Sequence, residues 1–171
     1  HELAVQIYDE FRMFSAGMPM SASLCIGGAS IQRQLDELKQ NPHFVIGTPG
    51  RLTDLINRGA FNASMFTNVV LDEVDRMLDI GFRKDIRFLI SKLSPTRQSA
   101  FFSATINRDT ENIMREFLKN PVIFSVKTRV TSDHIHQDVV HVKPGENKID
   151  VLYNLLKQQE FDRVIVFGRT K

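Results

Sequence analysis

The chain has 171 residues and 42% of them are hydrophobic, so it can bury a core and is not a disordered tail. Its 22 basic and 20 acidic residues leave a net charge of +2, which neither supports nor excludes RNA binding. A single cysteine, Cys25, excludes an internal disulfide, and no apolar stretch predicts a membrane span or a signal peptide. We expect an unexported protein of the cytoplasm, with the nucleus as the alternative, and no membrane partner.

Helical and strand patterns alternate in residues 1–126. Helical spacing of apolar residues predicts a helix that ends near Gly17, one that Ser30 caps, one that opens at 48–51, one long helix over 78–93 and one from about 107. Short apolar runs predict strands at 23–26, 43–47, 68–71, 99–102 and 122–126. This repeat of strand and helix predicts an α/β fold with a parallel sheet flanked by helices.

The composition changes after residue 126. Residues 127–138 are polar and show little periodicity, which predicts an interdomain linker. The pattern then resumes, with a strand at 139–142, a helix at 149–156 and a buried strand at 164–167. Because two strands and one helix cannot bury a core alone, residues 139–171 are interpreted as the start of a second domain.

Two adjacent acids, Asp72 and Glu73, follow the apolar run 68–71, and Asp75 comes shortly after. A run without alternation is typical of a strand buried on both faces of a parallel sheet, so these carboxylates should emerge at its carboxyl edge, where ligands bind. An aspartate there can hold Mg²⁺, usually through water, and a neighbouring carboxylate can act on the attacking water. The alternative is that the acids only end a strand and cap a helix.

Seven short motifs follow one another along the chain. They are Glu2-Leu3-Ala4, Gly27-Gly28, Thr48-Pro49-Gly50-Arg51, Asp72-Glu73-Val74-Asp75, Gly81-Phe82, Ser103-Ala104-Thr105 and Val164-Ile165-Val166-Phe167. In this order, at expected strand and helix edges, they resemble the DEAD-box family of ATP-dependent RNA helicases over nearly the whole chain. The resemblance implies a RecA-like sheet of the P-loop NTPase type and an ATPase that unwinds RNA duplexes or remodels RNA–protein complexes. It implies ATP and Mg²⁺ as cofactors, and RNA and other proteins as partners.

The resemblance also implies roles for the residues that match. Asp72 would position the Mg²⁺ of MgATP through water, and Glu73 would act on the hydrolytic water. Asp75 would link this loop to Ser103 and Thr105, whose hydroxyl groups can relay a change of hydrogen bonding when phosphate leaves. The alternative for the two hydroxyl residues is ordinary helix capping.

Two motifs are candidates for RNA phosphate contacts. In Thr48-Pro49-Gly50-Arg51, Thr48 can cap a helix and Pro49 fits its first position, while free amides of Gly50 and Arg51 and the Arg51 side chain face an anion. Gly27 and Gly28 let the backbone approach a second phosphate, since no side chain blocks it. Such contacts read the RNA backbone without base specificity. The alternatives are a capped turn and an ordinary glycine turn.

The chain departs from the family pattern at three places. Val74 stands where the family motif has alanine; it adds no chemistry, and we expect no loss of function. His1 stands where the family has an arginine, so that RNA contact is not carried over. No Gly-Lys dipeptide occurs, so the loop that cradles ATP phosphates is not present in these residues. We therefore expect residues 1–126 to be a partial first RecA-like domain without its P-loop unit, and the 171-residue chain alone to be inactive.

Two other functions stay open from the residues alone. One is a non-catalytic RNA-binding or interaction module that derives from a helicase. The other keeps the enzyme class but acts on DNA, because recognition of the ribose 2′-hydroxyl cannot be assigned to a position in this sequence.

Overall fold

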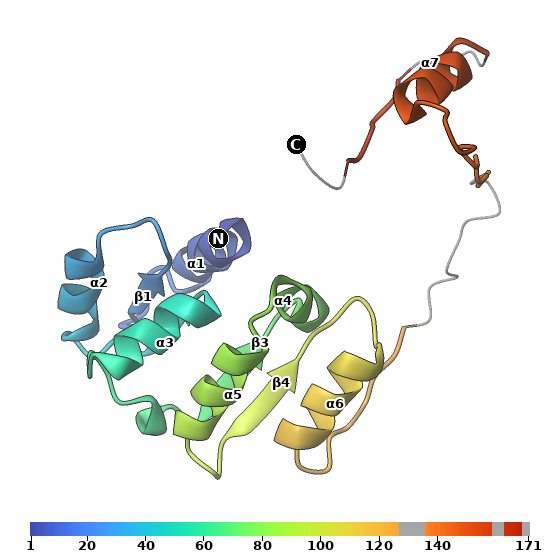
Figure 1. The fold of residues 1–171 in the computed structure, drawn as a ribbon. Coiled ribbons are helices and arrows are strands. Elements are labelled where there is room, and N and C mark those ends of the chain that lie inside the picture. Colours follow the sequence, from blue (N-terminus) through green and yellow to red (C-terminus); the bar gives the residue numbers. More distant parts are fainter. Residues whose placement is uncertain (127–135, 159–162, 169–171) are drawn as a thin grey trace. The chain divides into compact units, whose positions relative to one another are not determined.

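The structure is a computed structural model that describes residues 1–126, 136–158 and 163–168 (Figure 1). The chain divides into two compact units, residues 1–122 and residues 123–171. The domain boundaries expected at 126 and 139 stay predictions, and most of the expected linker, residues 127–135, lies outside the described residues.

The first unit alternates helices and strands. Its elements are α1 (Glu2–Phe14), β1 (Ala22–Cys25), α2 (Ile31–Leu38), β2 (Phe44–Gly47), α3 (Pro49–Asn57), the 3-10 helix η1 (Ala63–Met65), β3 (Asn68–Leu71), α4 (Val74–Ile80), α5 (Arg83–Lys92), β4 (Gln98–Phe101) and α6 (Arg108–Phe117). The first four predicted strands are confirmed to within one residue at each end. The Ser30 cap is also confirmed, since its hydroxyl accepts a hydrogen bond from the Arg33 amide.

The single helix predicted over 78–93 is wrong, because the chain forms two helices, α4 and α5. Gly81 ends α4 in the left-handed region, at φ 99°, where a residue without a side chain is favoured. The Gly81 and Phe82 amides donate to the Leu78 and Met77 carbonyls, which closes the last turn of α4. The apolar residues on both sides of this turn therefore belong to two helices, which pack into the same hydrophobic cluster.

The strands pair in parallel, as predicted, but the described strands form two pairs and not one sheet. In the first pair, β1 and β2 align with Cys25 opposite Gly47. In the second pair, β3 and β4 align with Leu71 opposite Phe101. Since no described strand joins the pairs by hydrogen bonds, each pair keeps open edges.

Two hydrophobic clusters hold the first unit together. One is formed by Val74, Ile86, Ile90 and Ile113, which join α4, α5 and α6 beneath the β3–β4 pair. The other is formed by Cys25, Leu38 and Leu55 of β1, α2 and α3, and all three are buried. Helices α3 and α5 lie side by side, so the part of the first unit built on β1 and β2 contacts the part built on β3 and β4 (Figure 1).

The expectation that the strand at 68–71 is buried on both faces is wrong. Leu71 packs against the α4–α5–α6 cluster, whereas Val70 is 62% exposed. The reason is that side chains alternate along a strand and the cluster covers only one face of the pair.

Three other predicted strands, at 122–126, 139–142 and 164–167, are not formed, and these segments are irregular. The expected burial of the last is also wrong, since Phe167 is 91% exposed. A strand needs a neighbour to satisfy its backbone groups, and the described residues provide none for these segments. In the second unit, the predicted helix is confirmed as α7 (Lys148–Gln158). Across the described ranges, every helix is too short or too polar to cross a bilayer.

Candidate functional site

Asp72 and Glu73 lie directly beyond the carboxyl end of β3. Oδ1 of Asp72 accepts a hydrogen bond from the Glu73 backbone amide at 2.9 Å. Glu73 precedes α4 in the left-handed region, at φ 51° and ψ 50°, and its side chain makes no capping hydrogen bond. Because a non-glycine residue is strained in this region, the surrounding contacts hold Glu73 in place. The Glu73 carboxylate therefore does not serve as the helix cap that the alternative interpretation requires.

Asp75 joins the acidic loop to the segment that follows β4. One of its oxygens, Oδ2, accepts hydrogen bonds from the Thr105 amide at 2.8 Å and from the Thr105 hydroxyl at 2.7 Å. The Ser103 hydroxyl accepts a bond from the Asp75 amide at 3.3 Å and donates to the Thr105 carbonyl at 2.7 Å. The structure thus brings together all three predicted residues, and Asn107, not Ser103 or Thr105, caps α6.

The register of β3 and β4 explains why these two loops meet. Leu71 and Phe101 end their strands opposite each other, so both loops leave the same edge of the pair. The Val74 amide then donates to the Phe102 carbonyl at 3.0 Å, which continues the pairing into the first turn of α4. Two segments distant in sequence are therefore held together by strand pairing before any side chain contributes.

The hydrogen bond from the Thr105 hydroxyl is the main cause that lowers the pKa of the Asp75 carboxyl below its usual value. Partial burial acts in the opposite direction, and backbone bonds from Thr105 and Arg76 add to the lowering. Asp75 is therefore held in its charged form, in which it can only accept hydrogen bonds.

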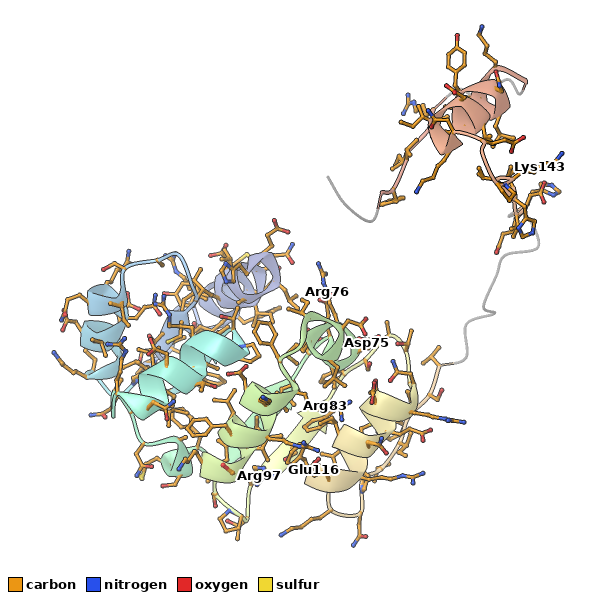
Figure 2. All side chains as sticks on the ribbon, in the orientation of Figure 1. Asp75, Arg76, Arg83, Arg97, Glu116 and Lys143 are labelled. Atoms are coloured by element: carbon orange, nitrogen blue, oxygen red, sulfur yellow. The ribbon has the colours of Figure 1, made fainter. Side chains whose placement is uncertain are left out.

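Arg76 contacts the Glu73 side chain from the next turn of α4. Its Nη1 lies 3.2 Å from Oε2 of Glu73, and both side chains are accessible to solvent (Figure 2). Exposed pairs of this kind contribute little to stability, so the contact mainly affects where the Glu73 carboxylate points. Sequence reasoning missed Arg76, although its spacing of three from Glu73 on a helix was a usable signal.

Asp72 fits a magnesium ion that keeps part of its water shell. Its Oδ1 is occupied by the Glu73 amide, whereas its Oδ2 has no hydrogen-bond partner within the described residues. In the same residues, no group of three His, Cys, Asp or Glu side chains could hold a metal on its own. A single carboxylate suits Mg²⁺, which commonly binds through one or two carboxylates, waters and substrate phosphates.

The two predicted phosphate-binding loops lie together at the carboxyl ends of β1 and β2. Gly27 and Gly28 follow β1, and the motif 48–51 follows β2 in the neighbouring position. The Thr48 amide donates to the Cys25 carbonyl at 3.0 Å, and Nη1 of Arg51 lies 3.5 Å from the Ala29 carbonyl oxygen. Both loops therefore face the same side of the strand pair, and Arg51 spans them.

The expectation that the Thr48 side chain caps α3 is wrong, since its hydroxyl makes no capping bond. The extended backbone of Thr48 continues the β1–β2 pairing, and only its carbonyl accepts from the Leu52 amide. Pro49 occupies the beginning of α3, as predicted. A methyl group added at Gly50 would lie 3.6 Å from the ring of Phe82, an ordinary contact distance, so the backbone here is open.

Two residues that sequence reasoning did not assign to the site border Gly27. The imidazole of His1 lies 3.2 Å from where a side chain on Gly27 would begin. Nε2 of Gln34 in α2 donates to the Ile26 carbonyl at 3.1 Å, just before Gly27. Gln34 could have been found, because it lies between Ile31 and Leu38 on the apolar face of a helix, where a polar residue is unusual.

Ion pairs connect α6, the helix that follows Thr105, to α5. Nη2 of Arg83 contacts Oδ1 of Asp109 at 2.5 Å, and Arg87 binds both carboxylate oxygens of Glu116 at 2.8–3.1 Å. The fork of an arginine defines the geometry of such a pair better than a lysine does. These pairs are exposed and add only a little to the apolar packing of Ile113, which holds α6 in the α4–α5–α6 cluster.

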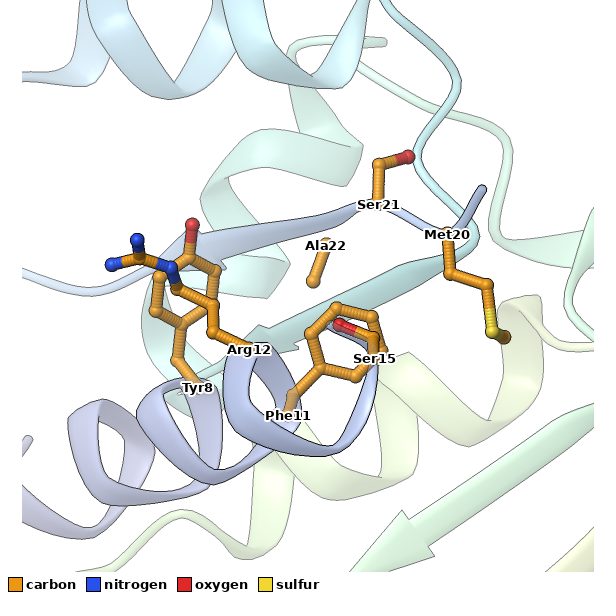
Figure 3. A pocket seen from close by; sticks show the side chains of 7 residues that line it. All are labelled: Tyr8, Phe11, Arg12, Ser15, Met20, Ser21 and Ala22. Carbon is orange, nitrogen blue, oxygen red and sulfur yellow. The ribbon is translucent and has the colours of Figure 1, made fainter. Parts of the chain in front are cut away.

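A hollow of about 310 Å³ lies away from these loops (Figure 3). Its lining comes from the second half of α1 and the beginning of β1, and includes Tyr8, Phe11, Arg12 and Met20. Because the candidate site lies at the carboxyl ends of the strands and this hollow lies at the opposite end of β1, it is not part of the site.

The family model of DEAD/DEAH box helicases matches residues 1–113 of the chain. The chain is 38% identical over 171 residues to the RNA helicase CrhR of Synechocystis sp.. It is 39% identical over 171 residues to the DEAD-box ATP-dependent RNA helicase CshA of Geobacillus kaustophilus. These matches cover 99% of this chain but only 35% and 36% of the two relatives, so the chain spans about a third of their length.

Two solved structures are similar to the fold. One is a hypothetical ATP-dependent RNA helicase from Sulfolobus tokodaii, with a TM-score of 0.66 and 30% identity over 70% of this chain and 36% of that chain. The other is a DEAD box protein from the hyperthermophile Methanococcus jannaschii, with a TM-score of 0.67 and 34% identity over 70% of this chain and 32% of that chain.

Proposed function

Because the chain belongs to the DEAD/DEAH box helicase family, we propose that it is part of an ATP-dependent helicase that unwinds RNA duplexes or remodels RNA–protein complexes. The predicted fold class, a RecA-like α/β fold with parallel strands flanked by helices, is confirmed by the two solved structures. The observation that carries the proposal is the hydrogen-bonded junction of Asp75 with Ser103 and Thr105, beside Asp72 and Glu73 at the same strand edge.

In this function Asp72 and Glu73 divide the work of ATP hydrolysis. Asp72 would hold Mg²⁺ through water, with its unoccupied Oδ2 as the accepting atom, and the bound ion would offset charge on the phosphates. Glu73 would orient the attacking water and take its proton. The strained backbone of Glu73 supports this role, since strain of this kind is concentrated at functional sites.

The junction of Asp75 with Ser103 and Thr105 would report the state of the nucleotide to the rest of the domain. A shift of the acidic loop would change the bonds that Asp75 accepts from Thr105. Helix α6 follows Thr105 and packs against α4 and α5 through Ile113, so it would move with that shift. This coupling between hydrolysis and movement is what a helicase needs.

The RNA would bind through its phosphates at the loops beyond β1 and β2. The first-turn amides of α3 have no acceptor within the helix, and the Arg51 guanidinium lies beside them. Gly50 and Gly28 leave the backbone open, since an added methyl group at Gly28 would meet nothing within 4 Å. Contacts of this kind carry no base specificity, which suits a helicase that acts on many sequences.

We expect the 171-residue chain alone not to hydrolyse ATP, because it contains no Gly-Lys loop to cradle the phosphates. A purified chain of these residues with RNA-stimulated ATP turnover, lost in Glu73→Gln, would overturn this part of the proposal.

The function is tested with the full-length protein and a short RNA duplex that carries one labelled strand. We expect strand release that requires ATP, together with single-strand binding that weakens with salt and with Arg51→Ala. Salt-dependent RNA binding without ATP-dependent strand release would favour the non-catalytic RNA-binding module. ATP-dependent release from a DNA duplex but not from the RNA duplex would favour the alternative enzyme that acts on DNA.

A further inference from the structure

Gln34 is a buried polar side chain beside the candidate RNA loops, with 3% of its surface exposed. It lies on α2, which packs against β1. Its Nε2 donates to the Ile26 carbonyl at 3.1 Å, whereas its Oε1 is buried and has no hydrogen-bond partner among the described residues. A buried amide with an unsatisfied oxygen costs free energy, so a packing role alone does not account for a glutamine here.

The segment that Gln34 contacts has few other restraints. Within the described residues, residues 26–29 make only two hydrogen bonds to the rest of the protein. One comes from Gln34 to Ile26, and the other comes from Arg51 to the Ala29 carbonyl at the limiting distance of 3.5 Å. Gly28, at φ 76°, lies between these two points in a conformation that is easily lost without restraint.

The two restraints differ in what happens to them when RNA binds. Arg51 carries the cation that the proposed function assigns to a phosphate, so its weak bond to Ala29 competes with RNA. Gln34 is buried, so RNA does not compete for its bond to Ile26. When Arg51 turns to a phosphate, Gln34 becomes the one remaining side-chain restraint on this loop among the described residues.

We propose that Gln34 is a positioning residue that holds the Gly27–Gly28 backbone in its RNA-binding geometry through the Ile26 carbonyl. This inference rests on the proposed function, because it assigns a purpose to a loop whose RNA contact is itself proposed. Gln34 touches no RNA and takes no part in the chemistry, so its effect appears in RNA affinity and not in the hydrolytic step.

The test is Gln34→Met in the full-length protein, with RNA affinity measured by fluorescence anisotropy on a labelled single strand. Methionine keeps the length of the side chain and removes both the Nε2 donor and the unsatisfied Oε1, so the thermal midpoint should be unchanged. We expect affinity about threefold to tenfold weaker, the value of one net hydrogen bond. The KM for RNA in RNA-stimulated ATP hydrolysis should rise by the same factor, with kcat unchanged.

A matched control is Gln32→Met, the same change on the exposed side of the same helix, which should leave RNA affinity unchanged. Limited proteolysis and hydrogen–deuterium exchange add readouts that do not depend on RNA. In Gln34→Met, cleavage within residues 26–29 should become faster, because only this loop loses a restraint, while the hydrogen-bonded amides of the first unit should exchange at an unchanged rate.

Arg51→Ala separates this inference from the proposed function. If Arg51→Ala weakens binding and Gln34→Met does not, the inference is overturned and the RNA site stands. If neither change affects binding, the RNA site itself is wrong. A Gln34→Met protein that fails to fold would also overturn the inference, and so would faster amide exchange throughout the first unit. In either case Gln34 would be needed for the stability of the whole unit and not for one loop.

Discussion

Thr105 donates two hydrogen bonds to one oxygen of Asp75, from its backbone amide at 2.8 Å and from its hydroxyl at 2.7 Å. Asp75 lies in the first turn of α4, beyond β3, and Thr105 lies in the loop after the neighbouring parallel strand β4; Ser103 closes the junction from the other side. Because both donors meet a charged acceptor, the strength of the junction depends on the ionisation of Asp75. The contribution of the junction to stability should therefore change with pH, which can be measured in solution.

Thr105→Val should lower the free energy of unfolding at pH 7 by about 0.5–1 kcal/mol, the value of one bond to a carboxylate after solvent screening. Folding lowers the pKa of Asp75, so its contribution is present above the unfolded pKa of about 4 and is lost as the pH falls through the folded pKa. The difference between Thr105→Val and the parent protein should therefore shrink in acid. Urea denaturation between about pH 3 and pH 7 measures it, and a difference independent of pH would contradict the assignment.

Glu73→Gly should stabilise the protein by up to about 1 kcal/mol, although it removes the proposed base. Glycine adopts φ 51° without the steric cost that Glu73 bears, and this relief exceeds the entropy cost of a more flexible unfolded chain. Glu73→Gln is the control, because it removes the charge and keeps the strain. Thermal unfolding of the two variants decides the matter, and a less stable Glu73→Gly protein would show that the backbone there is not strained.

Val74→Ala restores the residue of the family motif at a fully buried position in the α4–α5–α6 cluster. Removing two methyl groups from this cluster should cost about 1–3 kcal/mol, because it loses buried apolar area and leaves a small cavity. ATP hydrolysis by the full-length protein, at a temperature where both proteins are folded, should be unchanged, since the Val74 side chain contributes no polar atom. A changed rate with unchanged stability would mean that Val74 adjusts the acidic loop directly.

Gly47→Ala and Gly50→Ala form a matched pair with opposite expected outcomes. A methyl group at Gly47 would lie 2.3 Å from the Cys25 carbonyl oxygen, so this change should destabilise the β1–β2 pair by about 2 kcal/mol or more. A methyl group at Gly50 has room, with Phe82 at 3.6 Å, so this change should not destabilise the protein and can stabilise it by up to about 1 kcal/mol. It should nevertheless weaken RNA binding, because it covers the open backbone. Thermal unfolding and RNA binding of both variants show which glycine is needed for packing and which is needed for RNA binding.

Much of the fold could be predicted from the sequence because periodicity and chain punctuation are local. The strand before Asp72 and the Ser30 cap were visible in short windows. The break at Gly81 was missed because an apolar pattern that continues across a turn resembles one helix. The strand predicted at 164–167 is not formed. Its residues favour a strand, but within the described chain no neighbouring strand pairs with them.

The candidate site shows the same division. Asp72, Glu73 and Asp75 could be chosen because acids after an apolar strand point to a known edge of a parallel sheet. The bonds of Asp75 to Thr105 required the register of β3 and β4, which no short window contains. The contact of Gln34 with Ile26 likewise depends on how α2 packs against β1.

The most direct test of the central claim is the rate of phosphate release by the full-length protein at saturating ATP and RNA, compared between the parent protein and Glu73→Gln. If Glu73 acts on the hydrolytic water, Glu73→Gln should slow RNA-stimulated hydrolysis by about 10²–10⁴-fold while RNA binding is retained. RNA-stimulated hydrolysis by Glu73→Gln at a rate close to that of the parent protein would contradict the account.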